Sequence, residues 1–348
     1  MIVAIFVFAI CSNELVKRVY REEEKQRKLF LFLTGLAIVL YMGLRDASVG
    51  SDTLGYIEKY RWYAQYSLNQ ILNLYRTDLK DPTYYAVGWL FSRIFSEPQF
   101  WLCFVSAVYI SGVMLLVYRR SPAPLFSVFL FLCLSYVEFC MSGMRQAFAM
   151  GITLFALYPM EKRKPIPFVL IVVLASLFHT SAIVFLAAYP MSKLKLGGKH
   201  LVIFLGSLIL FFFFQDEVRQ LVQNVFEANR LSGYAESETA LNFTGYLIQV
   251  VIFLFCALTY PRVKACYEHA DLYYNLSFIG LTFQLFSSMV AEAFRLSLYF
   301  SVVNIVLLTM ALTVSDRKHR DLVTFTVMIV FLIYKFRAGL PEYQFFWQ

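Results

Sequence analysis

Charged residues are scarce in this 348-residue chain: Asp, Glu, Lys and Arg together make up 16% of it, against about 25% in a typical soluble domain. Hydrophobic residues make up 59%, and the mean hydropathy is +0.62. This composition excludes a disordered protein and argues against an ordinary cytosolic enzyme. It is the composition of a multi-pass membrane protein.

Cysteine pairs are also missing. The six cysteines are scattered and form no C-x-x-C pair, so neither a disulfide framework nor a thiolate metal site is supported. Residues 1–12 lack a basic n-region and a small-residue cleavage site. They predict a short first helix rather than a removable signal peptide.

Long apolar runs are abundant, and a spanning helix needs roughly 20 such residues. The clear candidates are residues 29–44, 99–118, 124–142, 145–160, 201–214, 243–260, 272–291, 294–314 and 322–336. The short run 2–11 is expected to extend towards Arg18, whereas 83–95 is aromatic and ambiguous. The expected fold is all-α: a polytopic, single transmembrane domain over 1–348 with about 10–12 transmembrane or re-entrant helices.

Basic residues predict the orientation through the positive-inside rule. We assign six segments to the cytoplasmic side, and every clustered basic run then lies there. They are 12–28, 119–123, 161–164, 191–200, 261–271 and 315–321. This topology places both termini outside, and it requires that 83–95 does not fully span and that 165–190 goes up and back as two short helices. Such helices would cover only about 20 Å of the ~30 Å hydrocarbon core. The alternative for 165–190 is one long tilted helix.

The net charge of +8 divides on this topology into +10 inside and −2 outside. The basic excess is therefore a topology signal, and a nucleic-acid partner loses its support. Outside, nine Arg stand against three Lys, and Arg is the residue suited to bidentate phosphate contacts. Two long outer segments, approximately 45–99 and 215–242, hold most of the non-membrane mass, so function is expected on the outer face.

Charged side chains at membrane depth are candidate functional residues. On the predicted topology several lie at outer helix ends, namely Arg45, Asp46, Arg145, Glu292 and Arg295, with His179 at the hairpin tip. Glu292 and Arg295 share a short turn, residues 291–295. His179 is the only histidine outside. Several Arg residues could bind a diphosphate, and a His can remove a hydroxyl proton near neutral pH.

Each candidate also has a structural interpretation. Arg45 and Arg145 could be interfacial anchors that snorkel to headgroups. The turn at 291–295 could contain a purely structural ion pair, and His179 could be a hydrogen-bonded packing residue. The turn-rich stretch 43–56 could cap its own backbone or form an anion-binding nest.

Four short motifs occur in a fixed order along the chain. They are Gly43-Leu44-Arg45 through Val49-Gly50-Ser51-Asp52-Thr53 to Tyr56; Arg145-Gln146-Ala147-Phe148-Ala149; Leu174-Ala175-Ser176-Leu177-Phe178-His179-Thr180-Ser181; and Arg295 with Tyr299-Phe300. The ordered set resembles the EpsG-like branch of the Wzy-type polysaccharide polymerases and covers most of the chain. Two features depart from the pattern: Ser51, where Thr is more often expected, and the short N-terminal helix, which leaves open a native start upstream.

The resemblance implies a GT-C-like membrane glycosyltransferase of the bacterial inner membrane. Such an enzyme joins undecaprenyl-diphosphate-linked oligosaccharide repeats into O-antigen of lipopolysaccharide, capsule or exopolysaccharide, with the active site facing the periplasm or outside. The absence of G-x-x-x-x-G-K-[ST] and G-x-G-x-x-G motifs agrees with this, because no nucleotide-sugar site is needed. The lipid-linked oligosaccharide and membrane lipid are the expected partners, and a chain-length regulator is a candidate protein partner. No cofactor, metal or nucleic acid is expected.

The resemblance also suggests residue roles. His179 is predicted to be the general base on the acceptor hydroxyl, and Asp52 to orient His179 or a sugar hydroxyl. Arg145 and Arg295 are predicted to bind the donor diphosphate, with Arg45 supporting them. The predicted substrate-binding residues are Tyr56, Gln146, Tyr299 and Glu292. Two alternatives remain: a flippase or transporter of lipid-linked oligosaccharide, for which an internal repeat would be expected, and an O-antigen ligase, which differs in its acceptor.

Overall fold

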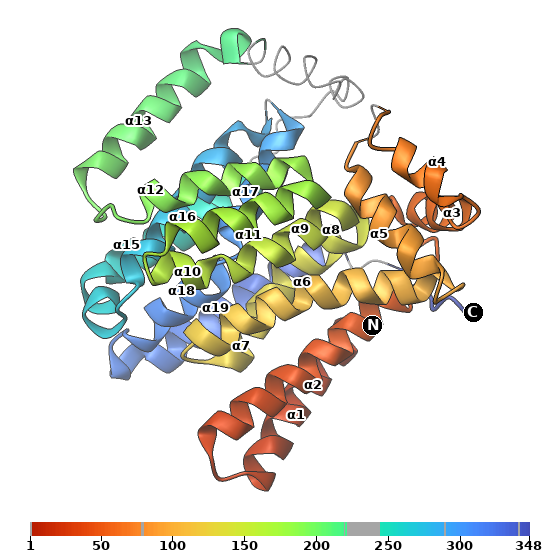
Figure 1. The fold of residues 1–348 in the computed structure, drawn as a ribbon. Helices are drawn as coiled ribbons and strands as arrows, with labels where there is room; N and C mark the ends of the chain where they lie inside the picture. Colours follow the sequence, from red (N-terminus) through yellow and green to blue (C-terminus); the bar gives the residue numbers. More distant parts are fainter. Residues whose placement is uncertain (1, 78–79, 219, 221–243, 289, 340–341) are drawn as a thin grey trace. The chain divides into compact units, whose positions relative to one another are not determined.

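The computed structural model describes residues 2–77, 80–218, 220, 244–288, 290–339 and 342–348, and the regular secondary structure within them is helical (Figure 1). Most of the predicted outer segment 215–242 lies outside the described residues. The chain divides into two compact units, residues 1–183 with 316–348 and residues 184–315. Each unit is described by itself.

The helices follow the predicted apolar runs. The first unit contains α1 (Ile2–Val19), α2 (Glu23–Gly43), α3 (Thr53–Tyr63), α4 (Leu68–Asn73), α5 (Pro82–Ser92), α6 (Pro98–Arg120), α7 (Pro124–Cys133), α8 (Tyr136–Ser142), α9 (Met144–Phe155), α10 (Leu157–Glu161), α11 (Pro165–Phe178) and α19 (Arg317–Arg337). The 3-10 helix η1 (Thr180–Ala187) crosses the division. The second unit contains α12 (Ala188–Met191), α13 (Gly198–Phe213), α15 (Thr244–Cys266), α16 (Ala270–Leu285), η3 (Phe286–Ser288), α17 (Ala291–Ser301) and α18 (Asn304–Thr313).

Among the described helices, α2, α6 and α15 are individually long and apolar enough to cross a membrane. Two bent pairs raise this number to five if each is one span: α7 with α8, bent by 52°, and α17 with α18, bent by 44°. Ser135, between α7 and α8, adopts a left-handed backbone with φ of 60°, which explains the first bend. The prediction of an all-α, polytopic membrane protein is confirmed.

The two ambiguous segments are both short. Helix α5 has 11 residues and spans about 16 Å at 1.5 Å per residue, which fits the prediction that 83–95 does not cross. The run 165–190 is broken at His179, whose backbone is extended with φ −155° and ψ 113°. This break rules out one continuous long helix and agrees with two short ones. The direction of the second piece relative to the first stays a prediction.

Small residues allow the helices of the first unit to pack closely. A Cβ on Gly43 of α2 would lie 2.2 Å from the Sγ of Cys103 on α6. A Cβ on Gly112 of α6 would lie 2.5 Å from the carbonyl oxygen of Gly151 on α9. Close backbone contact through small residues is the usual way membrane helices associate. Helix α6 is thereby packed directly against α9, which carries Arg145.

The C-terminal residues return to the end of α2. The Asp46 amide donates to the Gln344 carbonyl at 2.9 Å, within an isolated antiparallel bridge between Arg45 and Phe345. Helices α1 and α2 form a hairpin (Figure 1), so Ile2 lies at the same end of the unit. This agrees with the predicted placement of both termini on one side, and which membrane face this is stays a prediction.

In the second unit, α16 packs against α15 and α17. The hydroxyl of Ser297 on α17 donates to the Gly280 carbonyl on α16 at 2.8 Å. A Cβ on Gly280 would lie 2.9 Å from the backbone nitrogen of Ser301. This close contact fixes α17, the helix that carries Arg295 and Tyr299, against α16.

Candidate functional site

One buried carboxylate, that of Asp81, contacts both His179 and Arg145. Its Oδ2 lies 2.8 Å from His179 Nδ1 and 2.9 Å from Arg145 Nη1. Its Oδ1 accepts hydrogen bonds from the backbone nitrogen of Thr180 at 3.1 Å and from the Thr180 hydroxyl at 3.2 Å. Asp81 is only 4% exposed. A buried charge is tolerated when it is paired and hydrogen-bonded, and both oxygens of this carboxylate are.

The sequence around Asp81 explains its position. Asp81 precedes α5 in a left-handed conformation, with φ 58° and ψ 54°, which Asp tolerates better than most residues. Pro82 follows at the first helical position, where it is favoured. One turn later Tyr84 and Tyr85 enter an aromatic cluster, in which Trp101 of α6 donates its Nε1–H to the Tyr84 hydroxyl at 3.2 Å. The cluster holds the start of α5, and with it Asp81, against α6.

His179 is presented by the break between two helices. Its amide donates to the Ala175 carbonyl at 3.1 Å and ends α11, and its carbonyl accepts from the Ala182 amide at 2.9 Å and begins η1. Because the Asp81 carboxylate accepts from Nδ1, a neutral imidazole carries its proton there and has its free lone pair on Nε2. The contact with Asp81 is made through Nδ1 and leaves the second ring nitrogen, Nε2, for other partners. This nitrogen is the one that can accept a proton from a substrate.

Arg145 lies in the first turn of α9, as predicted from its position at a helix start. Besides Asp81, its Nη1 donates to the Lys80 carbonyl at 3.3 Å, and the guanidinium is hydrogen-bonded to Tyr56. It also lies 5.8 Å from the ring centroid of Tyr85. Its Nε is buried and has no hydrogen-bond partner among the described residues. Arg145 therefore retains hydrogen-bonding capacity beyond its contacts within the chain.

The surroundings keep Asp81 ionised. Burial on its own would raise the pKa of Asp81. The hydrogen bond and charge of His179, the charge of Arg145 and the hydrogen bond from the Thr180 amide outweigh it, and hold this pKa below the ordinary 3.8. Asp81 is thus a fixed negative charge at neutral pH.

Arg45 has a structural position. It is 1% exposed, and its Nη2 donates to the Met141 carbonyl at 3.1 Å and lies 3.2 Å from Met144 Sδ. Its Nε donates to the Thr53 hydroxyl at 3.1 Å, and its Nη1 donates to the Met42 carbonyl. The prediction that Arg45 supports diphosphate binding directly is therefore corrected, because its donors are used on acceptors of the chain itself. The same burial excludes snorkelling to headgroups.

The loop after Arg45 makes further contacts with the same segment, at Met141. Gly50 has a φ of +90°, and a Cβ there would lie 2.9 Å from the Met141 carbonyl oxygen. The Thr53 hydroxyl donates to the Val49 carbonyl at 2.6 Å and to the Met141 carbonyl at 3.2 Å. The stretch 43–56 thus binds the segment immediately before Arg145, which explains the Gly, Arg and Thr positions of this motif.

The acidic residues of the same stretch have local hydrogen-bond partners. Asp52 is exposed and accepts a hydrogen bond from Ser51 at 3.2 Å. The prediction that Asp52 orients His179 is wrong, because Asp81 occupies that position; its contact with a sugar hydroxyl stays a prediction. Asp46 accepts from the Ser48 amide at 2.9 Å, and the hydrogen bonds of Ser48 lower the pKa of Asp46. Here the structural interpretation, capping of a turn, is the one observed.

The predicted substrate-binding residues are distributed over both units. Tyr56 is next to Arg145, whereas Gln146 is buried with its Nε2 4.0 Å from Met150 Sδ. In the second unit Arg295 is half-buried on α17 and Tyr299 is buried.

Glu292 belongs to α17 as well, but its side chain lies outside the described part of the structure. The predicted turn 291–295 is in fact the first turn of α17, because the extended Val290 starts a helix there. The substrate contacts of these residues stay predictions.

Sequence reasoning missed Asp81. The available signal was an Asp directly before a Pro at the start of an aromatic run, which is typical of a helix start but carries no information on a distant partner. It also missed a partly buried ion pair between Lys335 of α19 and Glu138 of α8, whose side chains are 2% and 22% exposed. Both pairs join positions separated by many residues in the chain.

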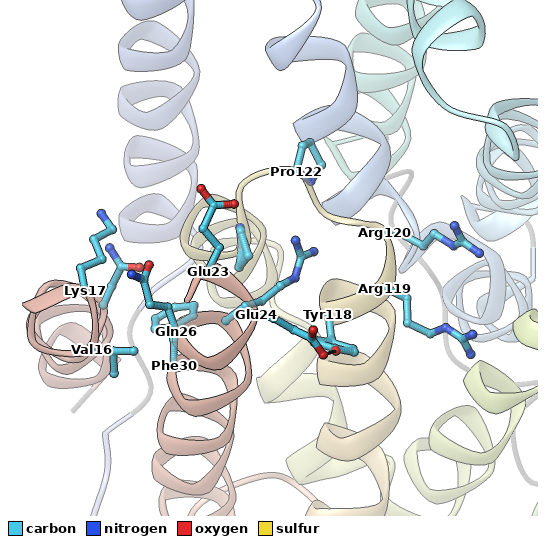
Figure 2. A pocket seen from close by; sticks show the side chains of 13 residues that line it. Val16, Lys17, Glu23, Glu24, Gln26, Phe30, Tyr118, Arg119, Arg120 and Pro122 are labelled. Carbon is cyan, nitrogen blue, oxygen red and sulfur yellow. Dashed lines mark hydrogen bonds between the residues drawn. The ribbon is translucent and has the colours of Figure 1, made fainter. Parts of the chain in front are cut away.

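A pocket of about 690 Å³ opens between the start of α2 and the end of α6 (Figure 2). There Tyr118 donates to Glu24 at 3.1 Å, and Arg120 pairs with Glu161, while Arg119 lies 3.9 Å from the ring centroid of Tyr158. The charged side chains Glu24, Arg119 and Arg120 of this pocket thus have partners within the chain, and the pocket lies at the other end of the helices from Asp81. Among the described residues there is no group of three His, Cys, Asp or Glu side chains placed to hold a metal ion.

Comparison with known protein families identifies a match over most of the chain. The model of the EpsG family matches residues 28–347, which include all four motifs and the three side chains around Asp81. No curated protein and no solved structure matches the chain. Because the match extends over nearly the whole length, this protein belongs to the EpsG family.

Proposed function

We propose that this protein is a polysaccharide polymerase that joins undecaprenyl-diphosphate-linked oligosaccharide repeats on the outer side of the bacterial inner membrane. Family membership supports polymerase-like chemistry. The observation that carries the proposal is the Asp81 carboxylate, which holds His179 and Arg145 side by side. The product is O-antigen, capsule or exopolysaccharide, and a chain-length regulator is the proposed protein partner.

The reaction assigns a separate task to each side chain. His179 Nε2 removes the proton from the acceptor hydroxyl, whose oxygen forms a bond to the anomeric carbon of the donor sugar. The bond between that carbon and the diphosphate oxygen breaks, and the electron pair leaves with the lipid diphosphate. Arg145 stabilises this developing charge through bidentate hydrogen bonds. Arg295 is proposed as a second diphosphate ligand.

Other residues position Arg145 or are proposed to contact the substrate. Tyr56 holds the Arg145 guanidinium from the side of α3. Arg45 acts at a distance, by fixing the chain immediately before Arg145. Asp52, Gln146, Tyr299 and Glu292 are proposed sugar or substrate contacts.

The test is a set of single substitutions in cells that lack the native copy, with polymer length read on a gel and insertion checked separately. His179→Ala, Arg145→Ala and Arg295→Ala should each abolish long chains. Arg61→Ala is the matched control, because Arg61 is exposed on α3 and should leave chain length unchanged. Intact polymer in all three variants would contradict the proposal.

The form in which saccharide accumulates separates the alternatives. Loss of a polymerase leaves single repeats on the carrier lipid, while loss of a ligase leaves polymer on that lipid. Loss of a flippase leaves repeats on the cytoplasmic face. Arg145→Lys is a further test, because a Lys keeps the charge but cannot make the bidentate contact; full activity would argue against bidentate binding.

A further inference from the structure

A single carboxylate oxygen serves both of the proposed reactive side chains. Asp81 Oδ2 contacts His179 Nδ1 at 2.8 Å and Arg145 Nη1 at 2.9 Å. In the proposed function these side chains act on different substrates, His179 on the acceptor and Arg145 on the donor. A diphosphate that binds Arg145 competes with Asp81, since both are anions that need the same guanidinium.

We propose that Asp81 couples donor binding to activation of the base: when Arg145 engages the donor diphosphate, the charge of Asp81 acts on His179 alone, and His179 becomes a stronger base. This inference rests on the proposed function. It makes Asp81 a positioning residue that acts through His179 and Arg145 without touching the reacting atoms.

The contacts of Asp81 determine which of the two partners it keeps. Its other oxygen accepts from the amide and the hydroxyl of Thr180, the residue that directly follows His179. Three hydrogen bonds therefore connect Asp81 to the break between α11 and η1, while an ion pair of 2.9 Å connects it to Arg145. Arg145 has a long side chain and a buried Nε without a partner among the described residues. Movement of Arg145 towards a diphosphate leaves the Asp81–His179 pair in place.

The elements that pack against α11 carry few charged groups besides Asp81 and Arg145. Changes at these two residues should therefore dominate the electrostatic effect on His179. Helix α11 packs against α5, α9 and α10. From these elements the charged groups are Asp81 and Lys80 before α5, Arg145 on α9, and Glu161 on α10, which is paired with Arg120. Helix α11 and η1 themselves contribute no ionisable side chain. Asp81 is the only carboxylate bonded to His179 in the described structure.

The coupling has a chemical consequence. With the donor absent, Asp81 is shared with Arg145, and His179 is a weaker acceptor for the proton of a hydroxyl. With the donor bound, the acceptor proton moves to His179 Nε2 as the new glycosidic bond forms and the diphosphate leaves. The acceptor is thus activated in the complex that also contains a leaving group.

Linkage makes the effect reciprocal. A protonated His179 draws the charge of Asp81 to itself and releases Arg145, so the diphosphate should bind more tightly when His179 is protonated. A full opposite charge within about 4–6 Å shifts a titration by about 1–3 units, and Asp81 changes partner only in part. The expected size is therefore about one pH unit, which corresponds to a change of about tenfold in affinity.

The experiment uses the full-length protein, purified in detergent and labelled with ¹⁵N-histidine. The chain has four histidines, so the His179 signals can be assigned with a His179→Gln variant. The pH at which His179 is half protonated is measured without and with undecaprenyl diphosphate. In the wild type we expect the lipid to raise this pH by about one unit. A midpoint that stays the same or falls overturns the proposal.

Asp81→Asn separates the coupling from the direct field of the diphosphate. Asn keeps the size of Asp but removes its charge, while the bound diphosphate remains. The upward shift should be lost in Asp81→Asn, and a shift of wild-type size there would refute the role of Asp81. Binding of the lipid in the wild type but not in Arg145→Gln, without a shift, would refute the coupling and leave the proposed function standing. Equal binding to wild type and Arg145→Gln would refute the diphosphate site itself.

Discussion

Removal of the Arg45 side chain should destabilise the protein, because this guanidinium is buried and all of its observed partners belong to the chain. In Arg45→Ala the carbonyls of Met42 and Met141 and the hydroxyl of Thr53 lose a charged donor. Hydrogen bonds to charged groups contribute about 1.5–3 kcal/mol each, and the cost of burying the guanidinium offsets part of this. We expect a net loss of about 3 kcal/mol in the free energy of unfolding.

The buried cysteines supply the assay. Cys133, Cys140 and Cys256 are buried in the folded chain, so a thiol-reactive dye reports their exposure during heating in detergent. Arg45→Ala should unfold several degrees below the wild type, and Arg45→Lys at an intermediate temperature because it keeps the charge but not the fork of donors. Arg61→Ala is the control and should unfold with the wild type. An Arg45→Ala protein with wild-type unfolding and lost affinity for undecaprenyl diphosphate would refute the structural role and restore Arg45 as a direct ligand.

Three further predictions concern the same unit. Gly50→Ala should lower the unfolding temperature by an amount that corresponds to at least about 1 kcal/mol, since Gly50 has a φ of +90° and its Cβ would meet the Met141 carbonyl at 2.9 Å; Gly55→Ala, with nothing within 4 Å, is the control, and equal effects would contradict the reasoning. Because the pKa of Asp81 is lowered in the folded protein, its ionised form contributes stability that is fully present above pH 3.8 and is lost as the pH falls through the lower pKa of the folded state. The difference in unfolding temperature between wild type and Asp81→Asn should therefore shrink in acid. A difference that grows in acid would contradict the ionised state of Asp81. Lys335→Met should cost about 1–3 kcal/mol by leaving the half-buried Glu138 without its cation, with earlier labelling of the buried Cys133 on heating. Lys335→Met combined with Glu138→Gln should recover part of the loss, and no recovery would argue against the ion pair.

Apolar runs predicted the helices well because length and hydropathy are local properties. The run 2–11 extends to Val19 in α1 as expected, and the break at His179 agrees with the polar residues in the middle of 165–190. The bend at Ser135 was not predicted, because a left-handed residue between two apolar helices leaves no clear mark in a continuous hydrophobic run.

The candidate site was predicted only in part. The sequence singled out His179 and Arg145, since a lone His and an Arg at a helix end stand out in apolar surroundings. Asp52 was predicted to be the partner of His179 because this carboxylate lies within a recognisable motif. Asp81 lies 98 residues from His179 in the chain, and only the tertiary packing of α5 brings the two together. Arg45 was misassigned for the opposite reason: its motif is conspicuous, but only the fold shows that its donors are directed at Met141 and Thr53.

His179 and Arg145, both held by the buried Asp81, are proposed to catalyse chain growth on lipid-linked repeats. The most direct measurement is reconstitution of the purified protein in vesicles with defined undecaprenyl-diphosphate-linked repeats, followed by separation of the products on a gel. We expect a ladder of longer lipid-linked chains with the wild type and with Arg61→Ala, and single repeats only with His179→Ala. Chain growth by His179→Ala at the wild-type rate would contradict it.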